Sequence, residues 1–453
     1  MKDIRELYLV YKDLKEITLI ARVRNNRQGK VVSFLVLNDG TTLNDIQVVY
    51  KPETKGFDQA TKARVSSIVE VRGLIVLTPG KQQEFEIQAQ EITLLDQAIE
   101  DYPLQKKEHS PEFLREISHL RARTKTFQAI FRIRSMAAFA IHKFFQEKNY
   151  VYVNTPIITE NDAEGAGEAF VVTTREDANY EEDFFGKKAS LTVSGQLNGE
   201  AYAQAFKNIY TFGPTFRAEN SNTSKHAAEF WMIEPEMAFC DLKGNLEIIE
   251  DLVRYTINYV FENAKDELDF CNENLEEGLI EKLNIVRNSK FAVNKYEEVI
   301  KILKKAVEDG HIFEEPNIEF GLDLGTEHER YICEVVNKCP TFVTDYPKEI
   351  KAFYMKQNQD NKTVAAADLL VPGIGELVGG SQREDDFEKI ITRCKEMGID
   401  PEELDWYNGL RNYGYYKSAG FGLGFERLIM YITGAQNIRD VISFPRTPRN
   451  LLF

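Results

Sequence analysis

The chain has 453 residues, of which 43% are hydrophobic and 28% are charged. These proportions are those of an ordinary globular protein with room for two or three domains, and they exclude a disordered or fibrous chain. The start of the chain has no signal-peptide pattern, and no apolar run reaches membrane-spanning length. We therefore expect a cytoplasmic protein with no membrane partner.

The formal net charge of −16 argues mildly against a nucleic-acid partner, because phosphate contacts need Lys and Arg. The charge is uneven, however: residues 1–100 contain fourteen Lys and Arg and fourteen Asp and Glu. The stretch from Arg22 to Lys30 carries four cations and no acid before Asp39. This basic strip could contact nucleic acid, or it could be a solvated edge strand. The five cysteines form no CxxC pair and predict neither disulfides nor a zinc site.

Five short β-type runs follow one another at residues 17–24, 31–39, 45–50, 67–77 and 84–95. Runs of this length in about eighty residues predict a small closed barrel of the OB-fold type, in a domain that spans residues 1–100. Phe34 lies in the second run, opposite the basic strip. An aromatic ring beside cations on a barrel face can stack on an unpaired base. The alternative is that Phe34 belongs to the barrel core.

Residues 101–125 are charged and contain Pro103 and Pro111, which predicts a hinge with a short helix before a second domain over residues 126–453. Apolar residues then recur at helical spacing over 127–148, and a strand follows that ends near Pro156. Residues 191–206 read as a strand, a polar turn and a helix. Ser194 and Gln196 at this turn could present neutral donors and acceptors to a small ligand.

The stretch from 209 to 239 has two aromatic-rich runs around a polar loop, the pattern of a long antiparallel hairpin. Strand alternation would place Arg217 and Glu219 on one face, and Phe230, Glu234 and Glu236 would share a face on the returning run. These charges lie among so many apolar residues that we expect the hairpin to be buried on both sides. Buried charges need a partner or a ligand.

Residues 240–320 hold two helical stretches with an acid-rich spacer. Further on, Asp368 and Glu376 bracket a Gly/Pro turn at the ends of adjacent strands, which suits Mg²⁺. Arg383 offers a forked donor for an oxygen-bearing side chain. The alternative is an ordinary strand-turn with surface charges. The chain ends with a Gly-rich turn, AGFGLGFERL, and an amphipathic helix that carries Arg427.

The segment FRAENSNTSKHAAEF resembles motif 2 of the class II aminoacyl-tRNA synthetases that handle aspartate, asparagine and lysine, and FWMIEPEMAF resembles the bacterial asparaginyl branch. GLGFERL resembles motif 3, and the helix, strand and proline at 127–156 resemble motif 1. The resemblance covers nearly the whole chain. It implies an α+β protein with an OB-fold anticodon-binding domain, then an antiparallel sheet flanked by helices with a helical insert near 240–320. It also implies a homodimer.

The activity that this resemblance implies is ligation of L-asparagine to tRNA(Asn) through an asparaginyl-adenylate, with ATP and Mg²⁺ as cofactors. Arg217, Glu219 and Arg427 would be catalytic. The implied ATP contacts are Arg217, His226, Phe230, Glu376 and Arg427, and the metal ligands are Asp368 and Glu376. The implied amino-acid contacts are Glu164, Ser194, Gln196, Glu234 and Arg383, with Glu164 in a Gly-rich loop that closes over the substrate. The implied anticodon contacts are Arg27, Phe34, Gln47 and Glu86.

The first alternative is an aspartyl-tRNA synthetase, either discriminating or charging both tRNAs. Gly199 speaks against it, because aspartyl enzymes carry Lys there, and so does Glu234, which is Asp in those enzymes. The second is an OB-fold nucleic-acid binder with an inactive synthetase body, although such a body would lose its pocket charges. Lys225 departs from the family pattern, since relatives often have Arg at this position.

Overall fold

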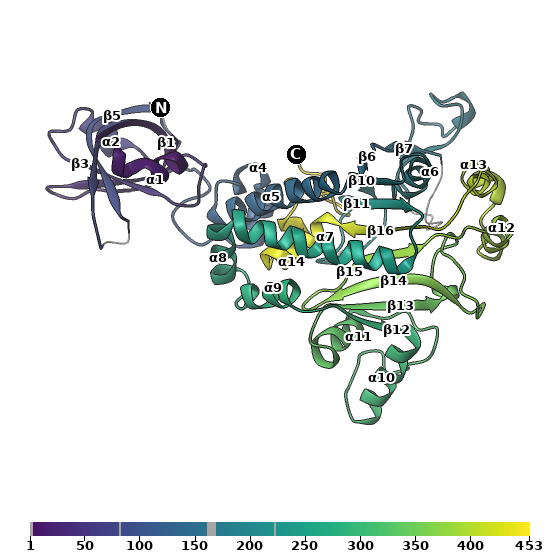
Figure 1. Cartoon of the computed structure of the whole chain (residues 1–453). Helices are drawn as coiled ribbons and strands as arrows, with labels where there is room; N and C mark the ends of the chain where they lie inside the picture. Colours follow the sequence, from purple (N-terminus) through teal and green to yellow (C-terminus); the bar gives the residue numbers. More distant parts are fainter. Residues whose placement is uncertain (1–2, 81–82, 161–168, 222) are drawn as a thin grey trace. The chain divides into compact units, whose positions relative to one another are not determined.

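The computed structural model describes residues 3–80, 83–160, 169–221 and 223–453. The chain divides into two compact units, Met1–Ala129 and Ile130–Phe453 (Figure 1). We call them the N-terminal unit and, after the synthetase body that the resemblance implies, the catalytic-domain unit, and we describe each by itself.

Five strands of the N-terminal unit close into a barrel in the order β1-β2-β3-β5-β4, which confirms the predicted OB-fold. The pair β3–β5 is parallel and the other pairs are antiparallel. Leu35 and Leu37 point into the barrel core, so Phe34 and Val36 alternate onto its outer face, where they are half-buried. The strands are β1 (Glu16–Arg27), β2 (Ser33–Asn38), β3 (Ile46–Tyr50), β4 (Ile68–Leu77) and β5 (Phe85–Asp96).

Short helices complete this unit: α1 (Ile4–Val10), α2 (Phe57–Lys62), α3 (Pro111–Glu116) and α4 (Ser118–Arg121). The segment between β5 and α3 has no regular structure, but its Tyr102 and Leu104 are buried. Helix α3 starts where the sequence dictates, because Ser110 accepts a hydrogen bond from the Phe113 N–H at 3.2 Å and Pro111 takes the first helical position.

An eight-stranded sheet in the order β12-β13-β14-β15-β16-β11-β10-β6 forms the centre of the catalytic-domain unit. Its six inner strands are antiparallel, whereas β12 and β6 pair in parallel at the two edges. The predicted α+β class with a largely antiparallel sheet is thus confirmed. The strands are β6 (Val151–Tyr152), β10 (Asn208–Phe216), β11 (Glu229–Ala238), β12 (Ala292–Lys295), β13 (Thr341–Pro347), β14 (Thr363–Val371), β15 (Gly375–Gln382) and β16 (Ser418–Gly424). A small second sheet contains β7 (Ile158–Thr159), β9 (Ala189–Leu191) and β8 (Val171–Val172).

Helix α7 covers one face of the large sheet (Figure 1), where Asn245 Nδ2 donates to the Gly420 carbonyl at 3.0 Å. Gly380 faces this side, and an added Cβ there would lie only 2.7 Å from Phe421 Cβ. The opposite face carries the residues of interest for function. The longer helices of the unit are α5 (Lys125–Glu147), α6 (Gln196–Phe206), α7 (Leu242–Asn263), α8 (Lys265–Asn274), α9 (Leu279–Asn288), α10 (Tyr296–Glu308), α12 (Phe387–Glu396) and α14 (Phe425–Thr433), and the short ones are α11 (Thr326–Arg330) and α13 (Asp405–Asn408).

Two local predictions differ from the structure. The hairpin strands β10 and β11 stop at Phe216 and resume at Glu229, so Arg217 and Glu219 belong to the connecting loop and not to a strand. The polar SNTSKHAA segment needs more room than a tight turn, and the loop therefore starts earlier than expected. The range 240–320 forms four helices, α7 to α10, rather than two. None of the helices in the described ranges is long and apolar enough to cross a membrane.

Candidate active site

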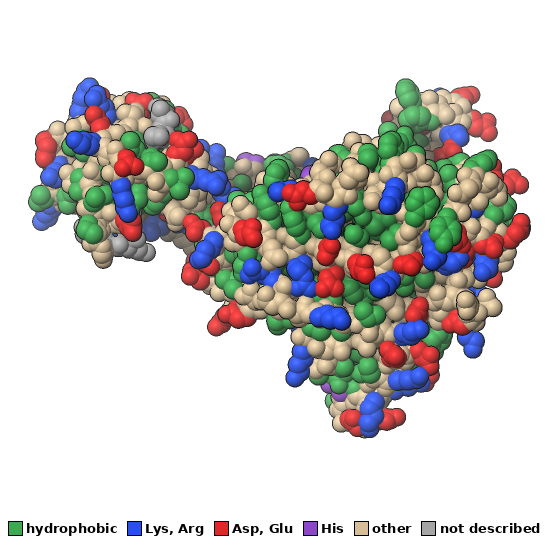
Figure 2. Space-filling model, in the orientation of Figure 1, with side chains coloured by type: hydrophobic (Ala, Val, Ile, Leu, Met, Phe, Trp, Pro, Cys, Tyr) green, Lys and Arg blue, Asp and Glu red, His purple; other side chains and the backbone are tan. Residues whose placement is uncertain are grey.

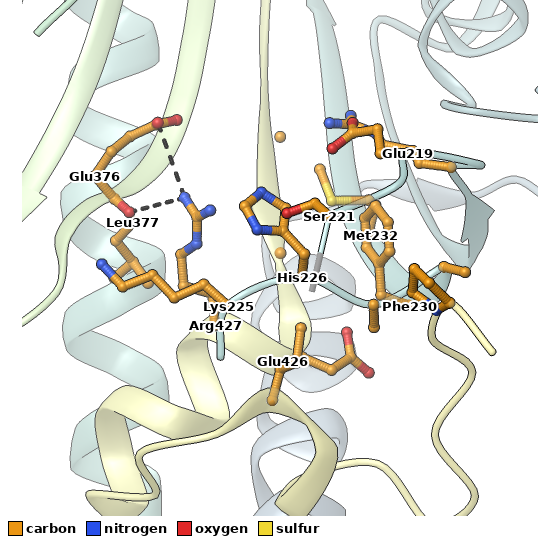
Figure 3. A pocket seen from close by; sticks show the side chains of 17 residues that line it. Glu219, Ser221, Lys225, His226, Phe230, Met232, Glu376, Leu377, Glu426 and Arg427 are labelled. Carbon is orange, nitrogen blue, oxygen red and sulfur yellow. Dashed lines mark hydrogen bonds and ion pairs between the residues drawn. The ribbon is translucent and has the colours of Figure 1, made fainter. Parts of the chain in front are cut away.

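A cavity of about 240 Å³ opens over the sheet face opposite α7 (Figure 3). Strands β11, β15 and β16, the first turn of α14 and the loop between β10 and β11 contribute its walls. The residues that line it include Arg217, Glu219, Ser221, Lys225, His226, Phe230, Met232, Glu376, Glu426 and Arg427. We call it the main cavity. All the predicted ATP contacts therefore border one space.

Glycines leave this space open. Gly422 and Gly424 of β16 border the main cavity, and an added Cβ at Gly422 would lie 2.8 Å from the Met232 Cε. The register pairs Gly422 with Gly379 on β15, and Gly379 in turn pairs with Asp368 on β14. Strands that lack side chains at paired positions present bare backbone, so a ligand can lie close against the sheet.

Cations gather on the other walls. The Arg217 guanidinium lies 5.5 Å from the centroid of the Phe230 ring. Arg427 Nη1 donates to the Glu376 carbonyl at 3.0 Å and lies 3.8 Å from its carboxylate (Figure 3). Lys225 Nζ donates to the Ile374 carbonyl at 3.4 Å, and burial followed by the nearby Arg427 lowers the pKa of Lys225. Positive charge facing an open space favours a polyanionic ligand.

His226 also lines the main cavity (Figure 3). Its Nδ1 lies 2.5 Å from Thr223 Oγ1, which holds the orientation of the ring. Glu219 points into the cavity from the opposite side (Figure 3).

Two carboxylates converge over Gly379. A Cβ added at this glycine would lie 3.3 Å from Asp368 Oδ1 and 3.1 Å from Glu376 Oε1, so both acids border a space that a side chain would fill. Lys351 Nζ contacts Asp368 Oδ2 at 2.6 Å. In the described part of the chain no group of three or more His, Cys, Asp or Glu side chains is arranged to hold a metal. Two acids are nevertheless enough for Mg²⁺, which takes one or two carboxylates together with water and phosphate oxygens.

Glu329 lies behind these two acids. Its Oε2 accepts the Glu376 N–H at 3.0 Å, and the side chain is largely buried. Burial, together with the neighbouring Glu376 and Asp368 carboxylates, raises the pKa of Glu329 to about 7, although the hydrogen bond from the Glu376 backbone opposes this rise. The arrangement concentrates negative charge, as expected where a cation binds.

The predicted amino-acid contacts within the described ranges do not line the main cavity but lie further along the same sheet face. Glu234 accepts hydrogen bonds from the Ser194 hydroxyl, the Gly195 N–H at 2.9 Å and Thr211 Oγ1 at 3.2 Å. Gln196 Nε2 donates to Glu200 Oε1 at 3.0 Å. Glu234 and Ser194 therefore contact each other directly, while Gln196 joins a separate buried group. Glu164 and the Gly-rich loop around it lie outside the described residues.

Arg383 has a different environment from the one expected of an open donor. It is 2% exposed, and it donates from Nε to Glu236 Oε2 at 3.1 Å and from Nη2 to Glu236 Oε1 at 2.5 Å. Glu200 lies 3.5 Å from Arg383 Nε and 3.3 Å from Arg411 Nη2. Although burial opposes its charge, the Glu236 and Glu200 carboxylates raise the pKa of Arg383. We call Glu200, Glu236, Arg383 and Arg411 the buried quartet. Its two acids and two guanidiniums balance in charge.

Comparisons with known proteins agree with this geometry. The family described as tRNA synthetases class II (D, K and N) matches residues 110–448, and an OB-fold nucleic acid binding domain matches residues 17–95. An asparagine–tRNA ligase from Mycoplasma mycoides is 74% identical over 453 residues, with both chains fully covered, and one from Mesoplasma florum is 72% identical over the same length. The solved asparaginyl-tRNA synthetase from Pyrococcus horikoshii, complexed with asparaginyl-adenylate, superposes with a TM-score of 0.86 at 32% identity and 96% coverage of each chain.

The chain belongs to the class II tRNA synthetases, in their asparaginyl branch. Within this synthetase the four predicted anticodon contacts form one connected row on the barrel. The Arg27 guanidinium lies 5.5 Å from the centroid of the Phe34 ring, and its Nη2 donates to Gln47 Oε1 at 3.1 Å. Gln47 Nε2 in turn lies 3.4 Å from Glu86 Oε2. Phe34 is half-buried and lies outside the barrel core.

The synthetase site also contains residues that sequence reasoning did not place there. Lys225 was noted only as a departure from the family pattern, yet its position beside His226 was a usable signal. Glu329 was not among the predicted site residues. Lys351, Glu200 and Arg411 gave no signal, because an isolated charge in a sequence does not reveal that it is buried.

Proposed function

We propose that this synthetase joins L-asparagine to tRNA(Asn) with ATP, through an asparaginyl-adenylate. The observation that carries the proposal is that Arg217, Phe230, Glu376 and Arg427 border one cavity over bare glycine backbone. The names of the relatives support asparagine as the amino acid, and the relative from Pyrococcus horikoshii holds the proposed intermediate.

In the first step a carboxylate oxygen of asparagine forms a bond to the α-phosphorus of ATP. The bond from that phosphorus to the bridging oxygen breaks, and pyrophosphate leaves. Arg217 would stabilise the charge that builds on the α-phosphate oxygens, as preorganised donors do in acyl and phosphoryl transfer. Phe230 and Arg427 would cover the two faces of adenine, and His226 and Lys225 would meet the outer phosphates.

In the second step a ribose hydroxyl at the end of the tRNA attacks the carbonyl carbon of the adenylate, and AMP leaves. Glu219 lies in the same cavity and would orient this ribose. No side chain forms a covalent bond in this scheme, so the rate enhancement comes from positioning and charge.

Asp368 and Glu376 would hold Mg²⁺ in the space over Gly379. Bound there, the ion would neutralise charge on the ATP phosphates. Lys351 pairs with Asp368 and would hold the orientation of that carboxylate.

The choice of asparagine over aspartate would depend on the buried quartet and on Glu234. Arg383 already forms ion pairs with Glu236 and Glu200, so these acids compensate its positive charge before a substrate binds. The carboxylate of aspartate would therefore gain little attraction from Arg383. A neutral amide can share these donors, with Glu234 or Glu236 accepting from its NH₂. The side-chain carboxylate of aspartate would add a buried negative charge that lacks a partner. The free-energy cost of this unpaired charge would exclude aspartate from the site. An aspartyl-tRNA synthetase, the second candidate, would need an additional cation here, and Gly199 provides none.

A homodimer is also part of the proposal. Phe139 on α5 is 58% exposed, and Val151 and Tyr152 on the sheet edge β6 are each 38% exposed. Figure 2 shows apolar side chains on the surface of this unit over α5 and around α6. Exposed apolar groups beside an open strand edge are typical of an interface. We further propose a cytoplasmic location, which fits the five free cysteines.

Isotope exchange between pyrophosphate and ATP tests the first step without tRNA. We expect exchange to depend on asparagine and to be far weaker with aspartate. Arg217→Ala should lower kcat for exchange by about 100- to 1,000-fold, the usual effect of removing one preorganised donor. Circular dichroism should show an unchanged fold. Near-normal exchange by this variant would contradict the phosphate role, and exchange that prefers aspartate would favour the second candidate.

A further inference from the structure

A second cationic space lies in the N-terminal unit, away from the predicted anticodon contacts. This cavity has a volume of about 260 Å³ between the barrel and the segment that leads to α3. Its cationic side chains come from three places in the sequence, and they are Arg22, Arg24, Lys106, Lys107, Arg123 and Lys125. Asp45 is the one carboxylate among the described residues that line it. We call it the basic cavity.

Two guanidiniums of the basic cavity converge on one hydroxyl. Ser66 Oγ accepts from Arg22 Nη1 at 2.9 Å and from Arg123 Nη1 at 3.1 Å. Arg22 Nη1 also donates to the Ser66 carbonyl at 2.8 Å. Burial, followed by repulsion from Arg123, lowers the pKa of Arg22. Holding two positive charges this close is unfavourable unless an anion compensates them.

The protein's own acids supply little of that compensation. Asp45 contacts Lys125 Nζ at 3.0 Å and lies 3.9 Å from Arg24 Nε, so it already serves two of the six cations. Across residues 3–80, 83–160, 169–221 and 223–453, no carboxylate lies within ion-pair distance of the other four cations, namely Arg22, Lys106, Lys107 and Arg123. Such an excess within a chain of net charge −16 points to an external anion.

We propose that the basic cavity binds a phosphate group of the tRNA backbone. Planar guanidiniums that already point into one space match the oxygens of a phosphodiester, and flanking lysines add charge at its rim. Such a contact carries no base information. It fixes the position of the nucleic acid on the N-terminal unit, while the row from Arg27 to Glu86 reads bases. The inference rests on the proposed function, which supplies tRNA as the polyanion. Inorganic phosphate has the same chemistry and is the other possible source.

Two variants of the full-length chain test the assignment. Arg123→Gln removes one converging charge and keeps an N–H donor for Ser66. Lys106→Gln/Lys107→Gln removes two exposed charges that make no ion pair, so this variant should fold even if the first does not. The control is Lys12→Gln/Lys15→Gln, which removes two exposed lysines of the same unit outside the cavity. The affinity for tRNA(Asn) is measured by fluorescence anisotropy over a series of KCl concentrations.

We expect each cavity variant to bind tRNA about three- to tenfold more weakly at 0.1 M KCl, with a log–log salt slope that is smaller by about one for each lost phosphate contact. The control variant should keep the wild-type slope. Unchanged tRNA affinity and slope in both cavity variants would overturn the proposal. A second measurement records the melting temperature with inorganic phosphate. Stabilisation by phosphate that is lost in the variants, with tRNA binding unchanged, would assign the cavity to a free anion and would also overturn the tRNA assignment.

Asparagine-dependent exchange between pyrophosphate and ATP separates this inference from the proposed function. The cavity variants should exchange at the wild-type rate, because this reaction involves no tRNA. If the wild-type chain itself showed no exchange, the proposed activity would fail. A salt slope that still depended on the cavity would then continue to support the tRNA-binding site.

Discussion

Glu200→Gln is the sharpest test of how the catalytic-domain unit tolerates its buried charges. Both carboxylate oxygens of Glu200 serve guanidiniums, Arg383 at 3.5 Å and Arg411 at 3.3 Å, and the side chains of Glu200 and Arg411 are fully buried. At an effective dielectric constant of about 20, each attraction amounts to about 5 kcal/mol before desolvation is subtracted. Removing one partner of such a group leaves an uncompensated buried charge, so we expect the free energy of unfolding to fall by about 3–5 kcal/mol.

Urea denaturation followed by tryptophan fluorescence measures this loss in the correct unit, because both tryptophans, Trp231 and Trp406, lie in Ile130–Phe453. The matched control is Glu297→Gln. Glu297 contacts Lys301 at 2.7 Å, but the two side chains are 67% and 69% exposed, and we expect a change below about 0.5 kcal/mol.

The double variant Glu200→Gln/Arg411→Gln restores the charge balance of the buried quartet. It should therefore lose less stability than the sum of the two single variants. If Glu200→Gln and Glu297→Gln lowered the free energy of unfolding equally, burial of the quartet would not contribute to stability. That result would refute the reasoning.

Three further predictions concern the site itself. Phe34→Ala should raise KM for tRNA about tenfold or more and leave pyrophosphate exchange unchanged, because stacking on a base is lost while the catalytic-domain unit is untouched; an equal loss in both assays would contradict this. Gly379→Ala places a methyl group 3.1–3.3 Å from Glu376 and Asp368 and should raise KM for Mg²⁺-ATP about tenfold, whereas Gly213→Ala, with nothing within 4 Å of its added Cβ, should have little effect. Lys225→Gln should raise KM for ATP about tenfold with little change in KM for asparagine, and an unchanged KM for ATP would remove Lys225 from the phosphate wall.

The sequence predicted the barrel well because β1, β2 and β4 largely alternate between buried and more exposed residues, which is the period expected of a strand. The long hairpin was also predictable, but its loop was not, since Arg217 and Glu219 follow an apolar strand and continue its alternation for a few residues. The extra helices of the 240–320 range escaped detection because an acid-rich spacer reads as a loop, whereas part of it forms the exposed faces of α8 and α9.

The candidate site, like the fold, could be predicted only in part from the sequence. Motif-like stretches located Arg217, His226, Phe230, Glu376 and Arg427 around one cavity. Side-chain partners depend on long-range packing and were not predictable. Arg383 looked like an open donor in sequence, yet its partner Glu236 lies 147 residues away and Glu200 comes from helix α6. Pairing between charges so distant in sequence is set by how the strands and helices pack together, which the identity of a single residue does not reveal.

Bare backbone at Gly379, Gly422 and Gly424 has an evolutionary consequence. A ligand can occupy this volume because the three glycines have no side chains. Every single substitution at these positions therefore adds atoms and makes the space smaller. No gradual series of larger side chains leads away from glycine. Any drift in ligand preference must therefore come through the side chains of the other walls, such as Lys225.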